Sequence, residues 1–236
     1  MIEIKNLHKK FGKNEVLTGI DLSIKDGGIF SVLGPNGSGK TTLIKTILGM
    51  VIPDKGEILI DGENILNSHK YRNQIDYLPQ IARFPGNLNV SELIKMIKDL
   101  RNSQTNRDAE LISHFKLEPF LNKKMNNLSG GTKQKVNLVL TFMFDSPLVV
   151  LDEPTSGLDP ISLLRLKKII NEEKEKGKTI LVTSHILSFV EEIADEVVFL
   201  LEGKIYFKGR IDELMTKTQQ PDFEHAIASL LSVSYA

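Results

Sequence analysis

Apolar residues repeat at two different spacings along the chain, and the two spacings alternate. Residues 29–33 form a short apolar run that ends at a glycine-rich turn, and residues 41–48 then repeat apolar side chains at helical spacing. Further along, helical spacing over residues 163–176 separates the apolar runs 148–151 and 179–183. This alternation is typical of parallel strands joined by crossover helices, so it predicts an α/β fold with a mostly parallel sheet.

Hydrophobic and polar residues follow a different pattern near the N-terminus. Short alternating stretches are separated there by glycines at positions 12, 27, 28, 56 and 62. Alternation with a period of two indicates strands with one buried face, and frequent glycines are typical of turns between antiparallel strands. We therefore expect an N-terminal antiparallel β subdomain made by residues 2–5, 16–18, 20–24 and 57–60.

The pattern becomes helical between about residues 87 and 127. Residues 90–100 are amphipathic, and residues 109–115 again have helical spacing after a polar stretch. We predict a helical subdomain inserted at this point into a single domain of residues 1–220. The C-terminal tail, residues 221–236, also has apolar residues at helical spacing, which predicts a helix.

The composition removes several classes of site. The 236 residues contain 30 Lys and Arg and 30 Asp and Glu, and a net charge of zero argues against nucleic acid bound on a broad basic face. Cysteine is absent, which excludes disulfides, Cys-ligated zinc and thiol nucleophiles. Apolar runs such as residues 197–201 are far shorter than the about 18 residues of a membrane span, and no signal-peptide core is present. Any role at a membrane is expected to depend on a partner.

A phosphate-binding loop is predicted directly after the first apolar run of the parallel pattern. The motif G-x-x-x-x-G-K-[ST] is matched by Gly34, Pro35, Asn36, Gly37, Ser38, Gly39, Lys40 and Thr41. Its glycines let successive backbone N–H groups turn inward, and the helix N-terminus that follows favours an anion. We expect Lys40 to bridge the β- and γ-phosphates of ATP, Thr41 to bind Mg²⁺ and Thr42 to contact the α-phosphate end. The alternative is a glycine-rich turn that starts an ordinary helix.

Two carboxylates follow the apolar run 148–151. Asp152 and Glu153 would lie at the C-terminal edge of a parallel sheet, where such sheets bind ligands. Asp152 is predicted to orient Mg²⁺ through water, and Glu153 to polarise the water that attacks the γ-phosphate. Taken alone, both acids could equally end a strand and begin a turn.

With these motifs placed, the chain resembles the ABC (ATP-binding-cassette) ATPases from about residue 1 to residue 214. The stretch Leu128, Ser129, Gly130 and Gly131 is similar to the family signature, which opens a helix and caps the γ-phosphate of ATP bound by the opposite subunit. Thr132 stands where the family usually has Gln, which puts the fine tuning of the motif in doubt. The resemblance implies a P-loop NTPase core. A Ser N-cap before an amphipathic helix would explain the same residues without a nucleotide.

Further residues take roles that the resemblance implies. Gln80 resembles the Q-loop glutamine, which ligates Mg²⁺ and senses a membrane partner, and residues 156–159 resemble the D-loop, which links the two sites of a dimer. His185 resembles the switch histidine that contacts the γ-phosphate, and Phe11 the aromatic residue that stacks on adenine. Each of these sites could also have a purely structural role. Gln80 could be a surface residue and residues 156–159 a turn that starts a helix. His185 could be a structural histidine and Phe11 a core residue. We read the other histidines as surface or core residues: His8, His69, His114 and His225.

The resemblance implies the ATP-hydrolysing subunit of an ABC transporter. Without a membrane span, the chain would pair with a second copy or a related ATPase, bind two Mg-ATP between them and dock from the cytoplasmic face on a separate permease. Part of the apolar content of residues 81–100 is expected to line the docking groove: Ile81, Phe84, Pro85, Leu88, Val90, Leu93 and Ile94. A soluble ABC protein acting on a ribosome or nucleic acid is the alternative. Similarity is greatest to ATPases of small ABC-2-type permeases, including the accessory ATPase of nitrous-oxide-reductase maturation.

Overall fold

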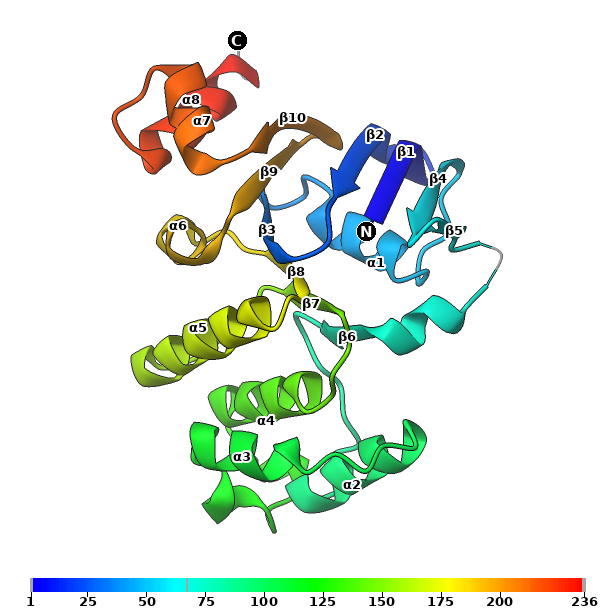
Figure 1. The fold of residues 1–236 in the computed structure, drawn as a ribbon, viewed down its shortest axis with the longest axis vertical. Coiled ribbons are helices and arrows are strands. Elements are labelled where there is room, and N and C mark those ends of the chain that lie inside the picture. The colour runs from blue at the N-terminus through cyan, green and yellow to red at the C-terminus, as the bar shows by residue number, and fades with distance from the viewer. Residues whose placement is uncertain (1, 67, 235–236) are drawn as a thin grey trace.

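The computed structural model describes residues 2–66 and 68–234, and within these residues the chain forms two β-sheets with helices around them (Figure 1). The larger sheet has the strand order β10-β9-β3-β8-β7-β6. Five strands of this sheet run parallel to one another: β9, β3, β8, β7 and β6. The sixth strand, β10, pairs with β9 antiparallel. The prediction of a mostly parallel sheet is therefore confirmed. The strands are β3 (Gly28–Leu33), β6 (Ile75–Leu78), β7 (Leu148–Asp152), β8 (Thr179–Thr183), β9 (Glu196–Leu201) and β10 (Lys204–Gly209).

The predicted N-terminal antiparallel sheet is also present, with the order β2-β1-β4-β5. Its strands are β1 (Ile2–Phe11), β2 (Asn14–Ile24), β4 (Lys55–Ile60) and β5 (Glu63–Asn64). The prediction of separate strands at residues 16–18 and 20–24 is wrong, because β2 is continuous through Gly19. Gly19 has φ +67°, and the β1–β2 register shifts along this part of the hairpin, so the irregularity bends the strand without ending it.

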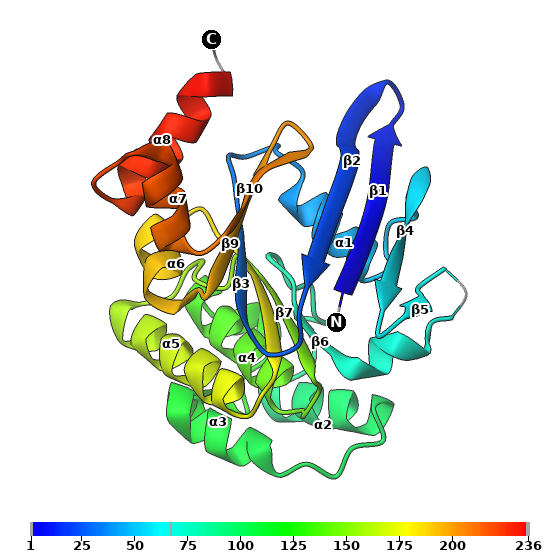
Figure 2. The ribbon, with the colours of Figure 1, turned by 45° about the horizontal axis from the view of Figure 1, so that its top comes forward.

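β3 supplies side chains to two separate hydrophobic cores. Ile29 and Leu33 join the core that includes residues of α4, α5 and α6, whereas Phe30 and Val32 join the core formed with α1 and the antiparallel sheet. Figure 2 shows β3 with α5 and α6 on one side and α1 on the other. The period of two in a strand produces this division. The phosphate loop predicted from the sequence therefore begins at the end of a strand that is packed on both faces. The helices are α1 (Lys40–Ile47), α4 (Gly130–Phe142), α5 (Pro160–Glu175) and α6 (Leu187–Ile193).

A helical subdomain occupies the region between β6 and α4. Asn89 caps its first helix with a capping box, accepting from the Glu92 amide at 2.8 Å while the Glu92 carboxylate accepts from the Asn89 amide at 2.9 Å. Val90, Leu93 and Ile94 are buried in the core, where they supply the packing face of an amphipathic helix, so they do not belong to the part of the apolar content that is expected to line a groove. The helices and 3₁₀ turns of this subdomain are α2 (Val90–Leu100), α3 (Arg107–Phe115), η2 (Glu118–Phe120) and η3 (Met125–Asn127), whereas η1 (Lys70–Gln74) precedes β6.

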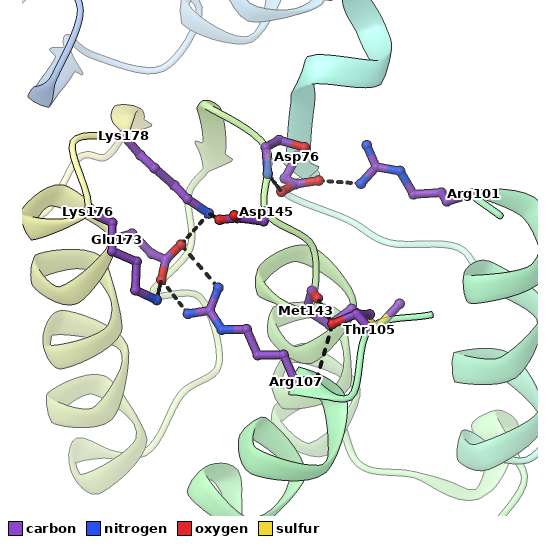
Figure 3. A network of polar contacts seen from close by, with 10 residues as sticks. Asp76, Arg101, Thr105, Arg107, Met143, Asp145, Glu173, Lys176 and Lys178 are labelled. Carbon is purple, nitrogen blue, oxygen red and sulfur yellow. Dashed lines mark hydrogen bonds and ion pairs between the residues drawn. The ribbon is translucent and has the colours of Figure 1, made fainter. Parts of the chain in front are cut away.

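Ion pairs join the connection between α2 and α3 to the parallel-sheet core (Figure 3). Arg101 pairs with Asp76 of β6, and Arg107 pairs with Glu173 of α5, with 3.2 Å between Nη1 and Oε2. The Glu173 side chain is fully buried, and Lys178 Nζ also lies 2.6 Å from its Oε2. A buried carboxylate is tolerated when cations surround it, so this cluster fixes the helical subdomain against α5.

The C-terminal segment adds α7 (Ile211–Thr218) and α8 (Phe223–Ser234). One face of α8 is buried in the core that contains α6, through Phe223, Ala226 and Ile227. The tail is therefore helical, as its apolar spacing predicts, and the apolar residues form its packing face. In residues 2–66 and 68–234, no helix combines the length and the apolar character that crossing a membrane requires.

Candidate nucleotide-binding site

The predicted phosphate loop connects β3 to α1. Gly34 has φ +151° and Gly39 has φ +107°. A Cβ at Gly34 would lie 2.0 Å from the Leu200 carbonyl oxygen, and one at Gly39 would lie 2.8 Å from the Val16 carbonyl oxygen, so neither position accepts a side chain. The loop is thus held tightly between β9 and β2. Ser38 Oγ is buried here without a hydrogen-bond partner among the described residues.

Lys40, the first residue of α1, folds its side chain back over the loop. Its Nζ donates to the carbonyl oxygens of Gly34 at 2.7 Å and Pro35 at 3.1 Å. Burial lowers the pKa of the Lys40 ammonium, and the carboxylates of Glu153 and Asp152 oppose that shift. A cation is therefore fixed where successive loop amides and a helix N-terminus would hold phosphate.

A pocket of about 370 Å³ opens beside the loop. Loop residues and the α1 residues Thr41 and Thr42 line it, together with Gln80 after β6 and Glu153 after β7. The phosphate loop, the segment with Gln80 and the acidic end of β7 thus meet at the C-terminal edge of the parallel sheet, although they lie far apart in the sequence. Asn14 and Val16 of β2 also line this pocket. The sequence did not predict this, because the two residues reach the pocket only through the packing of the two sheets against each other.

The two acids at the end of β7 are held by the neighbouring strand β8. Asp152 Oδ1 accepts a hydrogen bond of 2.6 Å from Thr183 Oγ1, and the Glu153 amide donates to the Thr183 carbonyl oxygen at 3.1 Å. Glu153 is buried and has φ +51°, a backbone conformation uncommon outside glycine. Its Oε2 lies 2.8 Å from Nδ1 of His185, so the predicted water-activating acid and switch histidine are in contact.

The residues present fit Mg²⁺ bound with a nucleotide. Among the described residues no group of three or more His, Cys, Asp or Glu could hold a metal alone. Thr41 and Gln80 instead offer a hydroxyl and an amide in the pocket, and the carboxylate of Asp152 lies at the end of β7, directly before the pocket residue Glu153. Mg²⁺ prefers oxygen ligands and is commonly held by few side chains together with phosphates and water, which such a set allows.

The predicted signature residues lie outside this pocket; Ser129 and Gly130 are exposed, Gly131 is half-buried and Leu128 is buried. Ser129 is the N-cap of α4, and its Oγ accepts from the Thr132 amide at 3.3 Å and lies 2.9 Å from Thr132 Oγ1. A Cβ at Gly130 would meet open space. Ser129 and Gly130 therefore present the start of α4 to the exterior, and their capping of a nucleotide stays a prediction.

Phe11 ends β1 and is 52% exposed, with the Lys9 ammonium 5.3 Å from its ring centre. It is not among the residues that line the pocket, although it pairs with Asn14, which is. Stacking of Phe11 on adenine stays a prediction.

Comparison with known proteins identifies the family. The ABC transporter family matches residues 17–156. The lantibiotic transport ATP-binding protein SrtF of Streptococcus pyogenes is 32% identical over 212 residues, covering 90% of this chain and 92% of that protein. The L-cystine import ATP-binding protein TcyC of Bacillus subtilis is 30% identical over 247 residues, covering 98% and 99%. The sequence similarity to these relatives therefore extends over nearly the whole chain.

Solved structures agree with the sequence relatives. A structure described as the ATP-binding subunit of an ABC transporter has a TM-score of 0.90 and 30% identity, covering 98% of this chain and 99% of that one. A dimeric ATP-binding cassette in a post-hydrolysis state, bound to ADP and Pi, has a TM-score of 0.80 and 25% identity, covering 89% and 98%. The chain belongs to the ABC transporter ATPase family, and it is an ATP-binding and ATP-hydrolysing subunit of an ABC transporter.

Proposed function

We propose that two copies of the chain enclose two Mg-ATP and that their closure and opening drive a separate membrane permease. The observation that carries the proposal is the separation of two half-sites: Lys40, Gln80 and Glu153 surround one pocket, while Ser129 and Gly130 face outward elsewhere. A second subunit would bring the signature residues to the nucleotide. The dimeric cassette bound to ADP and Pi supports this arrangement.

In this dimer the residues divide the chemistry among them. Lys40 and the loop amides bind the β- and γ-phosphates, and Thr41, Gln80 and Asp152 would hold Mg²⁺, which neutralises phosphate charge. Glu153 accepts a proton from the water that attacks the γ-phosphorus as the bond to the β–γ bridging oxygen breaks. His185, whose Nδ1 lies 2.8 Å from Glu153 Oε2, would orient that carboxylate and contact the γ-phosphate.

The permease is proposed to dock in a groove of about 440 Å³ beside the Q-loop segment. Residues after β6, including Ala82, Arg83 and Phe84, form one wall, and Ile97 of α2 and Leu140 of α4 form others. A short amphipathic helix from a cytoplasmic loop of the permease suits a groove whose apolar side chains lie beside polar ones, which include Arg83, Arg101 and Asn137. The chain would then be located on the cytoplasmic face of the membrane through its partner.

Similarity to the accessory ATPases of nitrous-oxide-reductase maturation stays a prediction, because the relatives' names span lantibiotic transport, cystine import and lipopolysaccharide export.

ATP-dependent dimerisation of Glu153→Gln tests the proposal. Removing the base should leave ATP bound and reduce hydrolysis by about 10²-fold or more, so that the closed dimer accumulates. Light scattering with ATP and Mg²⁺ should report a dimer, and the same sample with ADP should report monomers. A variant that binds ATP and stays monomeric would contradict the enclosed-nucleotide dimer.

A further inference from the structure

We propose that Gly203 is a positioning residue for the phosphate loop, residues 34–41, and that it sets the direction of one backbone N–H group that would bind phosphate. Gly203 lies in the turn between β9 and β10, far from the loop in the sequence. The inference deepens the proposed function, because it rests on ATP binding by that loop. It assigns part of the nucleotide affinity to a residue that does not touch the nucleotide.

The β9–β10 turn is a short hairpin turn whose second residue is buried. Leu201 pairs with Lys204, and between them Glu202 has φ +47° and Gly203 has φ +72°. Positive φ at both central residues is typical of a type I′ turn, a favoured connection between antiparallel strands. Glu202 is exposed, as residues of connecting turns usually are, but Gly203 is buried. Gly203 is therefore packed against other parts of the chain.

Both backbone hydrogen-bonding groups of Gly203 bind residues outside its own hairpin. Its amide donates to the Ser38 carbonyl oxygen in the phosphate loop at 3.1 Å, and its carbonyl oxygen accepts from the Thr18 amide of β2 at 2.9 Å. Ser38 and Gly203 are both buried, so the bond between them is costly to lose. One residue thus holds the phosphate loop and β2 together.

Gly203 has no room for a side chain. A Cβ here would lie 2.5 Å from the Val16 carbonyl oxygen and 3.2 Å from the Leu17 Cα, and backbone atoms cannot move aside as the end of a flexible side chain can. From the phosphate loop, a Cβ at Gly39 would lie 2.8 Å from the same Val16 carbonyl oxygen. Val16 lines the nucleotide pocket. The turn, β2 and the loop are therefore in close backbone contact beside this pocket.

The hydrogen bond to Ser38 also orients the next N–H group of the loop. The Ser38 carbonyl and the Gly39 N–H belong to one peptide unit, which is planar and trans, so the two groups point in opposite directions. Because Gly203 binds the carbonyl oxygen, the Gly39 N–H points away from the turn. Gly39 lines the pocket, and its amide donates to no acceptor in the described part of the chain. This N–H, at the N-terminus of α1, is thereby available to a phosphate.

The arrangement predicts an effect on nucleotide affinity that is separate from the chemical step. Backbone N–H groups of such a loop bind the α- and β-phosphates, which ATP and ADP share, whereas Glu153 is proposed to act on the attacking water. Loss of the restraint should therefore weaken the binding of both nucleotides by a similar factor. The kcat at saturating ATP should stay nearly the same, because the lost interaction is equal in the ground state and the transition state.

Gly203→Ala tests the inference. The added Cβ would meet the Val16 backbone and separate the turn from Ser38. Equilibrium titrations should show dissociation constants about tenfold higher for ATP and for ADP. Steady-state kinetics should show KM raised by a similar factor and kcat within about twofold of the wild type.

Gly62→Ala is the matched control, because Gly62 has the same position in the β4–β5 turn. Ile60 pairs with Glu63, and Asp61 and Gly62 have φ +50° and +81°, so the turn type is the same. Gly62 is exposed, and a Cβ there would meet nothing within 4 Å. The control thus introduces the same backbone strain away from the phosphate loop, and its nucleotide affinities and kcat should equal those of the wild type.

An ester in place of the amide between Glu202 and Gly203 provides a second test that adds no side chain. Ligation of a synthetic C-terminal segment can introduce it, and the all-amide chain made in the same way is its control. The ester removes only the N–H donor to Ser38, so this chain should fold even if Gly203→Ala does not. It should raise both dissociation constants about tenfold. In nuclear magnetic resonance spectra, the shift of the Gly39 amide signal on saturation with ADP should be smaller than in the control.

Three results would overturn the inference. Wild-type affinity for ATP and ADP in the ester chain would show that the hydrogen bond to Ser38 orients nothing. Equal weakening in Gly62→Ala would assign the effect to strained turns in general, and a loss of kcat at unchanged affinity would assign it to the chemical step. Failure of the loop assignment itself is distinguishable, because Lys40→Ala in the otherwise unmodified chain would then bind ATP like the wild type.

Discussion

Thr183 Oγ1 donates a hydrogen bond of 2.6 Å to Asp152 Oδ1, across the paired ends of β8 and β7. The same threonine accepts the Glu153 amide, at 3.1 Å to its carbonyl oxygen and 3.1 Å to its hydroxyl. Thr183 is fully buried, so these bonds are shielded from water. The residue that positions both acids of the site is therefore itself placed by the register of two parallel strands.

Thr183→Val should lower the ATPase kcat about tenfold, because Asp152 loses a buried donor whose removal costs about 1–3 kcal/mol. Valine preserves the shape of the side chain, and the carbonyl oxygen still accepts the Glu153 amide. Steady-state kinetics should show the loss mainly in kcat, with equilibrium ATP binding nearly unchanged. Thr183→Ser should retain most of the activity, and full activity of the valine variant would show that the hydroxyl is dispensable.

Lys40→Ala should weaken ATP binding at least about tenfold, since a hydrogen bond to a charged group contributes about 1.5–3 kcal/mol. Equilibrium titration with a fluorescent ATP analogue measures the change. Lys45→Ala is the matched control, because Lys45 lies on the same helix and is exposed. Equal affinities for the wild type and Lys40→Ala would rule out the assigned phosphate loop.

Glu173→Gln should destabilise the folded chain by about 3–5 kcal/mol at pH 7, because it leaves Arg107, Lys176 and Lys178 without their shared buried anion. Urea unfolding should show a lower midpoint. Glu172→Gln, at the preceding position, where the side chain is 41% exposed, is expected to change stability by no more than about 0.5 kcal/mol. Wild-type stability in Glu173→Gln would mean that the buried cluster makes no net contribution.

The same carboxylate predicts how stability depends on pH. Burial by itself would raise the pKa of Glu173, but hydrogen bonds from Arg107, Lys178 and Lys176 outweigh it and lower the pKa from 4.5 to about 2. A depressed pKa means that the contribution is complete above pH 4.5 and is lost as the pH falls from 4.5 to 2. The difference in unfolding free energy between the wild type and Glu173→Gln should shrink across this window.

Phe84→Asp should weaken co-purification with the permease, because it places a charge in the apolar wall of the proposed docking groove. Phe84 also packs partly against the core, so the variant could lose stability. Arg83→Glu avoids this problem, since Arg83 is exposed and lines the same groove. Both variants should retain basal ATPase activity.

Lys95→Glu provides the control for this docking experiment. Lys95 is exposed on α2 and does not line the groove, so its reversal should leave co-purification intact. If Arg83→Glu folds, hydrolyses ATP and co-purifies like the wild type, the permease must dock elsewhere.

The sequence was most informative where a function depends on neighbouring residues. The phosphate loop and the acids at 152 and 153 are recognisable because strand, turn and chemistry follow one another directly. Long-range pairing was not recoverable in the same way. Asn14 and Val16 reach the pocket only because the two sheets pack together, and Thr183 meets Asp152 only through the β7–β8 register.

The amphipathic segment after β6 left a different question open. The apolar residues from 81 to 94 could be assigned to a core or to a surface groove on composition alone. The structure buries Val90, Leu93 and Ile94 through the helical period of α2, and leaves Ile81 73% exposed. Their distribution follows from how α2 packs against the neighbouring helices, which a single amphipathic segment does not specify.

The double packing of β3 has an evolutionary consequence. The strand that ends in the phosphate loop is anchored by Ile29 and Leu33 in one core and by Phe30 and Val32 in the other. Insertions in the helical subdomain or changes in the tail perturb only one of these anchors, so the loop geometry survives them. Surfaces that face a permease can therefore diverge from one relative to another while the hydrolytic machinery of the subunit stays in place.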